Sequence, residues 1–204
     1  MTLQEIRALV PVPDEEMLPP PGLFLHESTL HGQAHVGRVM VHGLRLIEAT
    51  GAVEETIRLW AAVYLHDIAR RHDGVAPRHG AHACLRLREL PNTLGLFARA
   101  GLREADLPAV CTAVTRHSSG EGKRGEPHLL LIELLKDADG LDRVRLGDLD
   151  PRYLRIRQAR CMVQFATRLF EETDGKHVPG PHYFGWLWRS ALALSRKTRA
   201  RETE

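Results

Sequence analysis

Apolar residues recur three or four positions apart through most of the 204-residue chain, which is the pattern of amphipathic helices. The clearest example lies between residues 26 and 51, where the repeating positions are Ala34, Val36, Val39, Met40, Leu44 and Ile47. We expect Ser28 or Thr29 to cap the start of this helix and Gly51 to end it.

The same spacing predicts further helices along the chain, separated by stretches rich in proline, glycine and charge. They are expected at residues 1–10, 52–71, 79–90, 92–100, 104–118, 128–145, 153–172 and 183–197. No segment alternates β-branched and polar residues with period two, so no strand is predicted. The expected fold is therefore an all-α, single-domain helical bundle. An N-terminal helix and Pro-rich connector (1–27) precede the core (28–145), and C-terminal helices (146–204) pack on that core.

Composition narrows the function classes. The net charge of +2 gives no reason to expect a nucleic-acid or membrane surface. No apolar run reaches a membrane-spanning length, and acidic residues interrupt the first 25 positions, against a secretory signal. The cysteines Cys84, Cys111 and Cys161 are widely spaced within apolar patterns, which favours small buried side chains in a reducing compartment. These features predict a cytoplasmic protein.

Histidine is unusually frequent, with twelve in the chain, and many fall between residues 26 and 82. His31 and His35 are four apart and share a helix face, whereas His66–Asp67 ends the most apolar helix. A single inward histidine is most often a hydrogen-bonded core residue. Burying an ionised carboxylate without a partner, however, costs several kcal/mol, and a divalent cation offsets that cost directly.

Further candidate ligands lie on neighbouring helices: His79 at the start of one, His117 at the end of another, and the aspartates of KDADGLD. Neutral imidazole and carboxylate are ligands for Mn²⁺, Fe²⁺, Co²⁺, Ni²⁺ or Zn²⁺, with Mg²⁺ as a further candidate. The pattern therefore predicts a divalent metal site.

With His35 in HGQAHVGRV, His66–Asp67 in YLHDIARR and an aspartate in KDADGLDRV, residues 28–145 resemble the HD-domain superfamily of metal-dependent phosphohydrolases. The resemblance implies that His35, His66, Asp67 and Asp139 bind the principal metal. The family's Ala-Asp-x-Leu pattern selects Asp139 over Asp137, which would then lie on the substrate side. The positions of His79 and His117 match those of additional histidines in members that bind two metals.

The resemblance also implies a reaction. The expected function is cleavage of a phosphoester or phosphoanhydride by metal-activated water, in a nucleotide or another small phosphorylated metabolite. Asp67, His117 and Arg38 are the predicted catalytic residues, with His117 or Asp137 as candidates for proton transfer. Arg38, Arg70 and Asp137 are the predicted substrate contacts. Arg70 stands where the family often has lysine, so the contact with the substrate phosphate is expected to differ at this position.

Two alternatives remain open. Some proteins of the HD fold use the same six-ligand set in diiron oxygenases, and others sense a nucleotide without turnover. The aromatic residues Tyr183, Phe184, Trp186 and Trp188 either stack on a base or dock the last helix on the core. The loop 119–127 is either a mobile lid or an ordinary exposed connection. The sequence leaves open whether the chain forms a homodimer.

Overall fold

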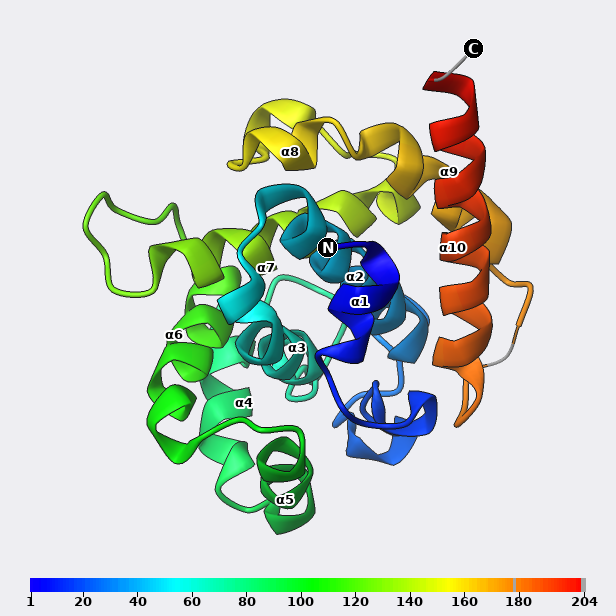
Figure 1. Ribbon diagram of the computed structural model, residues 1–204. Coiled ribbons are helices and arrows are strands. Elements are labelled where there is room, and N and C mark those ends of the chain that lie inside the picture. Colours follow the sequence, from blue (N-terminus) through cyan, green and yellow to red (C-terminus); the bar gives the residue numbers. More distant parts are fainter. Residues whose placement is uncertain (178, 203–204) are drawn as a thin grey trace.

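Helices α2 (Gln33–Thr50) and α3 (Thr56–Leu65) form the centre of the fold in the computed structural model, which describes residues 1–177 and 179–202 (Figure 1). Almost every side chain of α3 is buried, and α2 is buried over most of its length. Both helices lack a wide polar face because other helices cover them on several sides. Gly51, with a φ of 73°, ends α2 in the left-handed conformation, as predicted.

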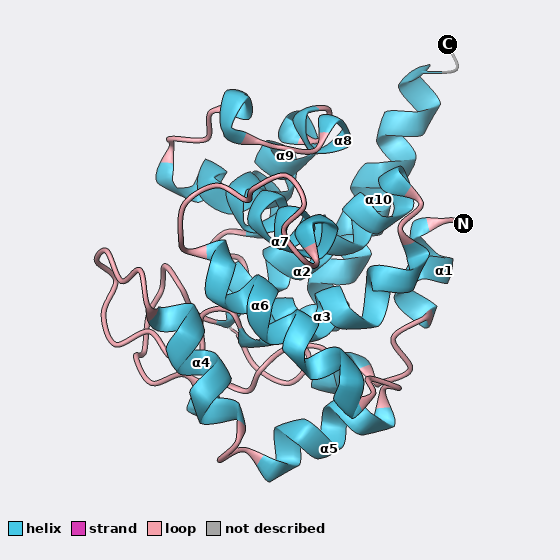
Figure 2. Cartoon of the chain, turned by 90° about the vertical axis from the view of Figure 1, so that its left-hand side faces the viewer, coloured by secondary structure: helices cyan, strands magenta, loops and turns pink. Residues whose placement is uncertain are grey.

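The remaining helices pack around this pair, and the described residues include no strand (Figure 2). The all-α prediction is confirmed. Helix α7 packs against α2 and α6, and α6 also contacts α3 and α4. The bounds are α1 Leu3–Ala8, α4 His79–Leu87, α5 Pro91–Arg99, α6 Leu107–His117, α7 Leu129–Leu141, α8 Arg157–Arg160, α9 Val163–Thr173 and α10 Tyr183–Glu202.

The proline-rich connector after α1 contains two short 3₁₀ turns, η1 (Asp14–Glu16) and η2 (Pro21–Leu23), and lies against α3. Trp60 in α3 is fully buried and donates its Nε1–H to the main-chain oxygen of Met17, 3.1 Å away. This bond satisfies the polar atom of the largest buried side chain and ties the connector to the core.

The predicted start of the long helix is wrong, because α2 begins at Gln33 with Gly32 at its N-cap. Ser28 instead accepts hydrogen bonds from the main-chain N–H groups of Leu30 and His31 and donates to Asp73. Its hydroxyl therefore stabilises a turn that precedes the helix.

The predicted helix over 153–172 is also wrong as a single element. The structure has a 3₁₀ turn, η6 (Pro151–Tyr153), then α8 and α9. The break has a physical cause: the carboxylate of Asp137 accepts the main-chain N–H groups of Arg155 and Ile156. Residues 154 and 156 are held extended, so a helix can begin only after them.

The last helix, α10, runs along one side of the molecule (Figure 1). Tyr183, Phe184 and Trp188 are buried at its start, and Phe184 stacks on Trp188. Of the two roles predicted for these aromatic residues, the structure supports docking of the helix on the core.

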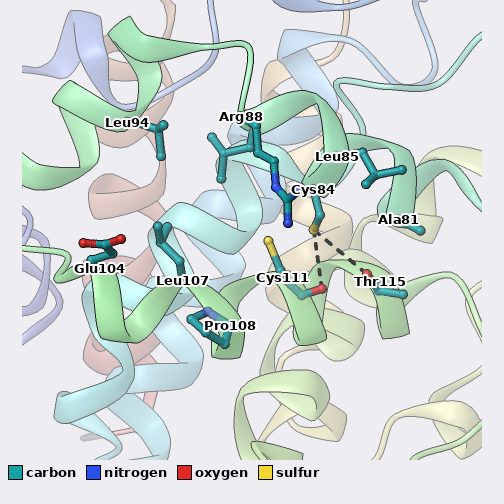
Figure 3. Close-up of a pocket in the computed structure, with 11 residues that line it drawn as sticks. Ala81, Cys84, Leu85, Arg88, Leu94, Glu104, Leu107, Pro108, Cys111 and Thr115 are labelled. Carbon is teal, nitrogen blue, oxygen red and sulfur yellow. Dashed lines mark hydrogen bonds between the residues drawn. The ribbon is translucent and has the colours of Figure 1, made fainter.

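The cysteines differ from the prediction of small buried side chains. Cys84 and Cys111 are half-buried and Cys161 is exposed, all as free thiols. Cys84 and Cys111 line a largely apolar pocket of about 630 Å³ among α4, α5 and α6 (Figure 3). Within the described residues, no helix combines the length and apolar character needed to span a membrane.

Candidate metal centre

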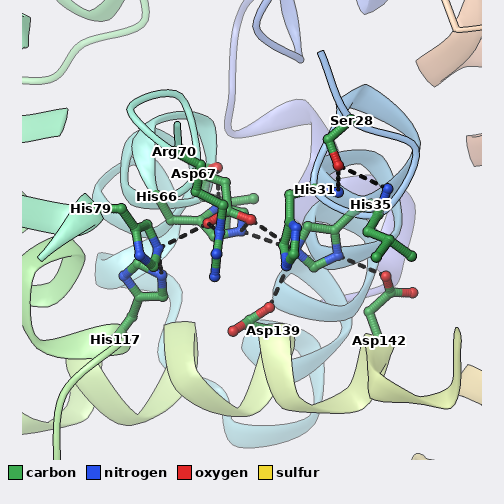
Figure 4. Close-up of polar contacts among 12 residues, drawn as sticks. Ser28, His31, His35, His66, Asp67, Arg70, His79, His117, Asp139 and Asp142 are labelled. Atoms are coloured by element: carbon green, nitrogen blue, oxygen red, sulfur yellow. Dashed lines mark hydrogen bonds and ion pairs between the residues drawn. The ribbon is translucent and has the colours of Figure 1, made fainter. Parts of the chain in front are cut away.

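Five helices bring the predicted ligands together (Figure 4). His35 lies in the first turns of α2, whereas His66 and Asp67 directly follow the last residue of α3. His79 begins α4 and His117 ends α6. Asp139 comes from the last turn of α7, so residues spread over a hundred positions meet between the helix ends.

The first group consists of His35, His66 and Asp139. The Nε2 atoms of His35 and His66 are 3.2 Å apart, and Asp139 Oδ1 is 3.2 Å from His35 Nε2. Both histidines are fully buried, whereas the Asp139 side chain is 33% exposed. The group is therefore accessible from the Asp139 side.

The second group consists of Asp67, His79 and His117. The Nε2 atoms of His79 and His117 are 2.9 Å apart, and Asp67 Oδ1 is 2.9 Å from His79 Nε2. The other carboxylate oxygen, Asp67 Oδ2, is 3.5 Å from His35 Nε2 and 3.7 Å from His66 Nε2. Asp67 thus faces both groups, one oxygen toward each.

Hydrogen bonds at Nδ1 fix how the four imidazoles are oriented. Nδ1 of His66, His79 and His117 faces the main-chain oxygens of Val63, Ala76 and Val114, respectively. Nδ1 of His35 faces Asp142 Oδ2 at 2.7 Å. Carbonyl and carboxylate oxygens only accept hydrogen bonds, so each neutral ring carries its proton on Nδ1 and its lone pair on Nε2.

When all four rings are neutral, these lone pairs converge in pairs, with no donor between them. Two acceptor nitrogens facing each other at 2.9–3.2 Å repel unless a positive charge lies between them. Donor atoms bound about 2.1 Å from one ion lie about 3.0–3.4 Å apart, close to the separations in both groups. The buried His/Asp groups could therefore hold metal ions.

Burial also favours the neutral imidazoles that metals require. It lowers the pKa of His66, and it lowers that of His117, with help from the neighbouring His66, to about 3. Although burial opposes ionisation of Asp67, the charges and hydrogen bonds of His66 and His79 hold its pKa well below the usual range. These shifts leave His66 and His117 neutral beside an ionised Asp67.

His35 behaves differently. Burial and Arg145 oppose its protonation, yet hydrogen bonds to Asp139 and Asp142 raise its pKa. An ion that binds His35 Nε2 would therefore displace a proton from that atom, and its affinity would fall as the pH falls.

Asp142, one of the KDADGLD aspartates considered as candidate ligands, instead holds His35 in place. Asp142 is fully buried and also accepts from Arg38 Nε at 2.6 Å and Arg38 Nη2 at 3.2 Å. His35 and Arg38 are three residues apart, as are Asp139 and Asp142, so each pair shares a helix face. The same three-residue spacing in both pairs is the sequence feature that indicates the contacts of Asp142 with His35 and Arg38.

The predicted phosphate ligands lie in different places. Arg38 is buried, pairs with Asp142, and lies over the Phe170 ring. Arg70 Nε donates to Asp67 Oδ1 at 2.8 Å, beside the second group. The phosphate contacts predicted for both arginines stay predictions.

Asp137 lies apart from both groups, although it is only two residues from Asp139. Its carboxylate is fully buried and engaged by Arg155 and Ile156. Geometry therefore selects Asp139 as the candidate ligand and gives Asp137 a role in shaping the chain after α7. Its predicted substrate contact is untested.

No family model, curated protein or solved structure matches the chain. The assignment of function therefore depends on the geometry of the site.

Proposed function

We propose that the chain is a metal-dependent phosphohydrolase of the HD-domain type, with a site for two divalent ions. The observation that supports this most strongly is the convergence of four Nε2 lone pairs and two carboxylates on adjacent points. His35, His66 and Asp139 would hold one ion, and His79 and His117 the other, with Asp67 between them. Nitrogen-rich ligand sets of this kind favour Mn²⁺, Fe²⁺, Co²⁺, Ni²⁺ or Zn²⁺ over Mg²⁺.

The bound ions would acidify a water molecule and polarise a phosphoryl oxygen. The side chains of the protein would position the ions and the substrate. Asp67 keeps the two groups adjacent, Asp142 orients His35, and the exposed side of Asp139 admits substrate. Nδ1 of His117 faces the main-chain oxygen of Val114, and its Nε2 faces His79 Nε2. This arrangement supports a role as metal ligand more than the proton transfer predicted for His117.

The direct test is phosphate release from a panel of nucleotides and aryl phosphates with Mn²⁺, Co²⁺, Ni²⁺ and Mg²⁺. We expect wild-type protein to hydrolyse at least one substrate and a His66→Ala/Asp67→Ala double variant to lose roughly a thousandfold or more of that rate. His82→Ala is a matched control, because His82 is exposed on α4, the helix that begins at His79. No release from any substrate by metal-loaded wild-type protein would refute the proposal.

A second function, that of a diiron oxygenase, remains a candidate because all six ligands of that class assemble here. It predicts that iron-loaded protein develops an absorption band in air and that iron, not Mn²⁺ or Co²⁺, supports turnover. Phosphate release with redox-inert Zn²⁺ or with Co²⁺ would favour the hydrolase. Nucleotide sensing without turnover predicts binding that survives loss of His66 and Asp67.

A further inference from the structure

A cavity of about 480 Å³ opens directly onto the candidate metal centre. His117 and Asp139, one residue from each metal-binding group, form part of its wall. Its other wall comes from the segment 148–155 and from Glu121 in the loop between α6 and α7. Its size is within the range of pockets that hold small metabolites.

Lys136 also lines this cavity, one turn before Asp139 on α7. The residue is only 6% exposed, and its ammonium donates to the main-chain oxygens of His117 (3.2 Å) and Ser119 (2.6 Å). An ammonium carries three donors, so one remains after these two bonds. Among the described residues, no carboxylate forms an ion pair with it.

The other cations of the cavity are already paired. Arg155 forms ion pairs with Glu121 and Asp137, and Arg143 pairs with Asp148. Among the described residues of the cavity wall, Lys136 is thus the lysine or arginine that forms no ion pair, although Glu121 and Asp139 lie near enough to act on its charge. A buried charge of this kind is stabilised by an anionic ligand.

We propose that Lys136 binds the phosphate of the substrate, and that this substrate carries a single phosphoryl group on a hydroxyl-rich body. The inference rests on the proposed function. Charge in the rest of the cavity limits the substrate, because Glu121, Asp148 and Asp150 also line it. Each of them is paired with an arginine, so the described part of the cavity offers no further unpaired cation for a second phosphate. The carboxylate oxygens can accept hydrogen bonds from sugar hydroxyls. A nucleoside monophosphate or sugar phosphate fits that distribution.

Lys136 also satisfies carbonyls at the end of α6, so the test must separate phosphate binding from helix capping. The probe is inorganic phosphate, titrated by calorimetry into Mn²⁺-loaded protein whose metal content is verified by elemental analysis. We expect Lys136→Met to weaken phosphate binding roughly 10- to 100-fold at unchanged metal content. Lys136→Arg should retain most of the affinity, because it keeps the charge.

Arg143→Gln is the matched control, since Arg143 lines the same cavity but is half-exposed and paired with Asp148. We expect it to change phosphate affinity less than about twofold. A Lys136→Met variant with a lower melting temperature but unchanged phosphate affinity would overturn the proposal. So would a nucleoside triphosphate that competes with phosphate at least ten times better than its monophosphate.

The two proposals fail separately. Metal-loaded wild-type protein that does not bind phosphate contradicts the role of Lys136. Protein that binds phosphate through Lys136 but hydrolyses nothing contradicts the phosphohydrolase and leaves the anion site standing.

Discussion

His42 lies in the core of α2 with both ring nitrogens buried and, among the described residues, without a hydrogen-bond partner. Burial lowers its pKa to about 4. The unfolded chain therefore binds a proton at His42 at a higher pH than the folded chain does. Stability contributed by the neutral ring is present above pH ~6.5 and is lost as the pH falls toward 4.

This difference predicts that wild-type protein loses roughly 3 kcal/mol of unfolding free energy through His42 between pH 7 and pH 4. A His42→Leu variant should lack that part of the loss. Urea denaturation of both proteins at the two pH values, with chelator present, measures the difference. Parallel pH dependence in the two proteins would contradict it.

Substitution of Asp142 is expected to lower the affinity of the protein for metal. Although burial opposes it, the hydrogen bonds and charges of His35 and Arg38 hold the pKa of Asp142 below its usual range. Asp142→Asn removes that charge and leaves one oxygen for two partners. Since loss of the partner that orients a metal-binding histidine weakens metal binding, we expect roughly 10- to 100-fold lower affinity.

Chelator competition with Co²⁺ measures this change. Asp148→Asn serves as the control, because Asp148 is a half-exposed aspartate nearby whose partner is Arg143. Equal affinities in the two variants would show that Asp142 does not position His35.

At the scale of elements, the close approach of α4 and α6 assembles the second metal-binding group. A Cβ at Gly80 would lie 1.9 Å from the main-chain oxygen of Val114, so only glycine permits this contact. Gly80→Ala should push the helices apart, destabilise the fold by roughly 1–3 kcal/mol and separate His79 from His117.

Gly95→Ala on α5 is the matched control, since a Cβ there meets nothing within 4 Å. It should stabilise the protein by about 0.5–1 kcal/mol. Thermal denaturation and metal content of both variants check the prediction. Gly80→Ala protein with wild-type stability and metal content would contradict it.

Elements were predictable from sequence where apolar periodicity and a stop signal agreed, as for α2 with Gly51 and for α4 after its turn. The errors came from side chains that bind main-chain atoms. Ser28 stabilises a turn and delays α2, and Asp137 in α7 interrupts the segment 153–172. The interruption depends on a contact between distant parts of the chain, which periodicity does not report.

At the scale of the whole molecule, the order of the motifs along the chain was enough to predict which residues share a site. The structure places the same six residues close together: His35, His66, Asp67, His79, His117 and Asp139. The motif order did not show that Asp67 faces both groups, because that depends on the turn after α3. Lys136 was missed for a similar reason: its neighbours at the end of α6 are distant in sequence.

Metal binding is expected to stabilise the whole fold, because the ligands lie at the ends of five helices. At a metal concentration about a hundred times the dissociation constant, each site adds about 2.7 kcal/mol. Melting curves with excess Mn²⁺ or with chelator should differ by several degrees. Ca²⁺ should have little effect, since it prefers oxygen ligands. Equal melting temperatures with Mn²⁺ and with chelator would count against the sites.

The most direct test is elemental analysis of purified protein at neutral pH without chelator, after loading with Mn²⁺ or Co²⁺ and removal of excess metal. We predict about two ions per chain in wild-type protein and about one in a His79→Ala/His117→Ala double variant. His82→Ala should retain the wild-type content. Less than about a tenth of an ion per chain in folded wild-type protein would contradict the metal centre and the function inferred from it.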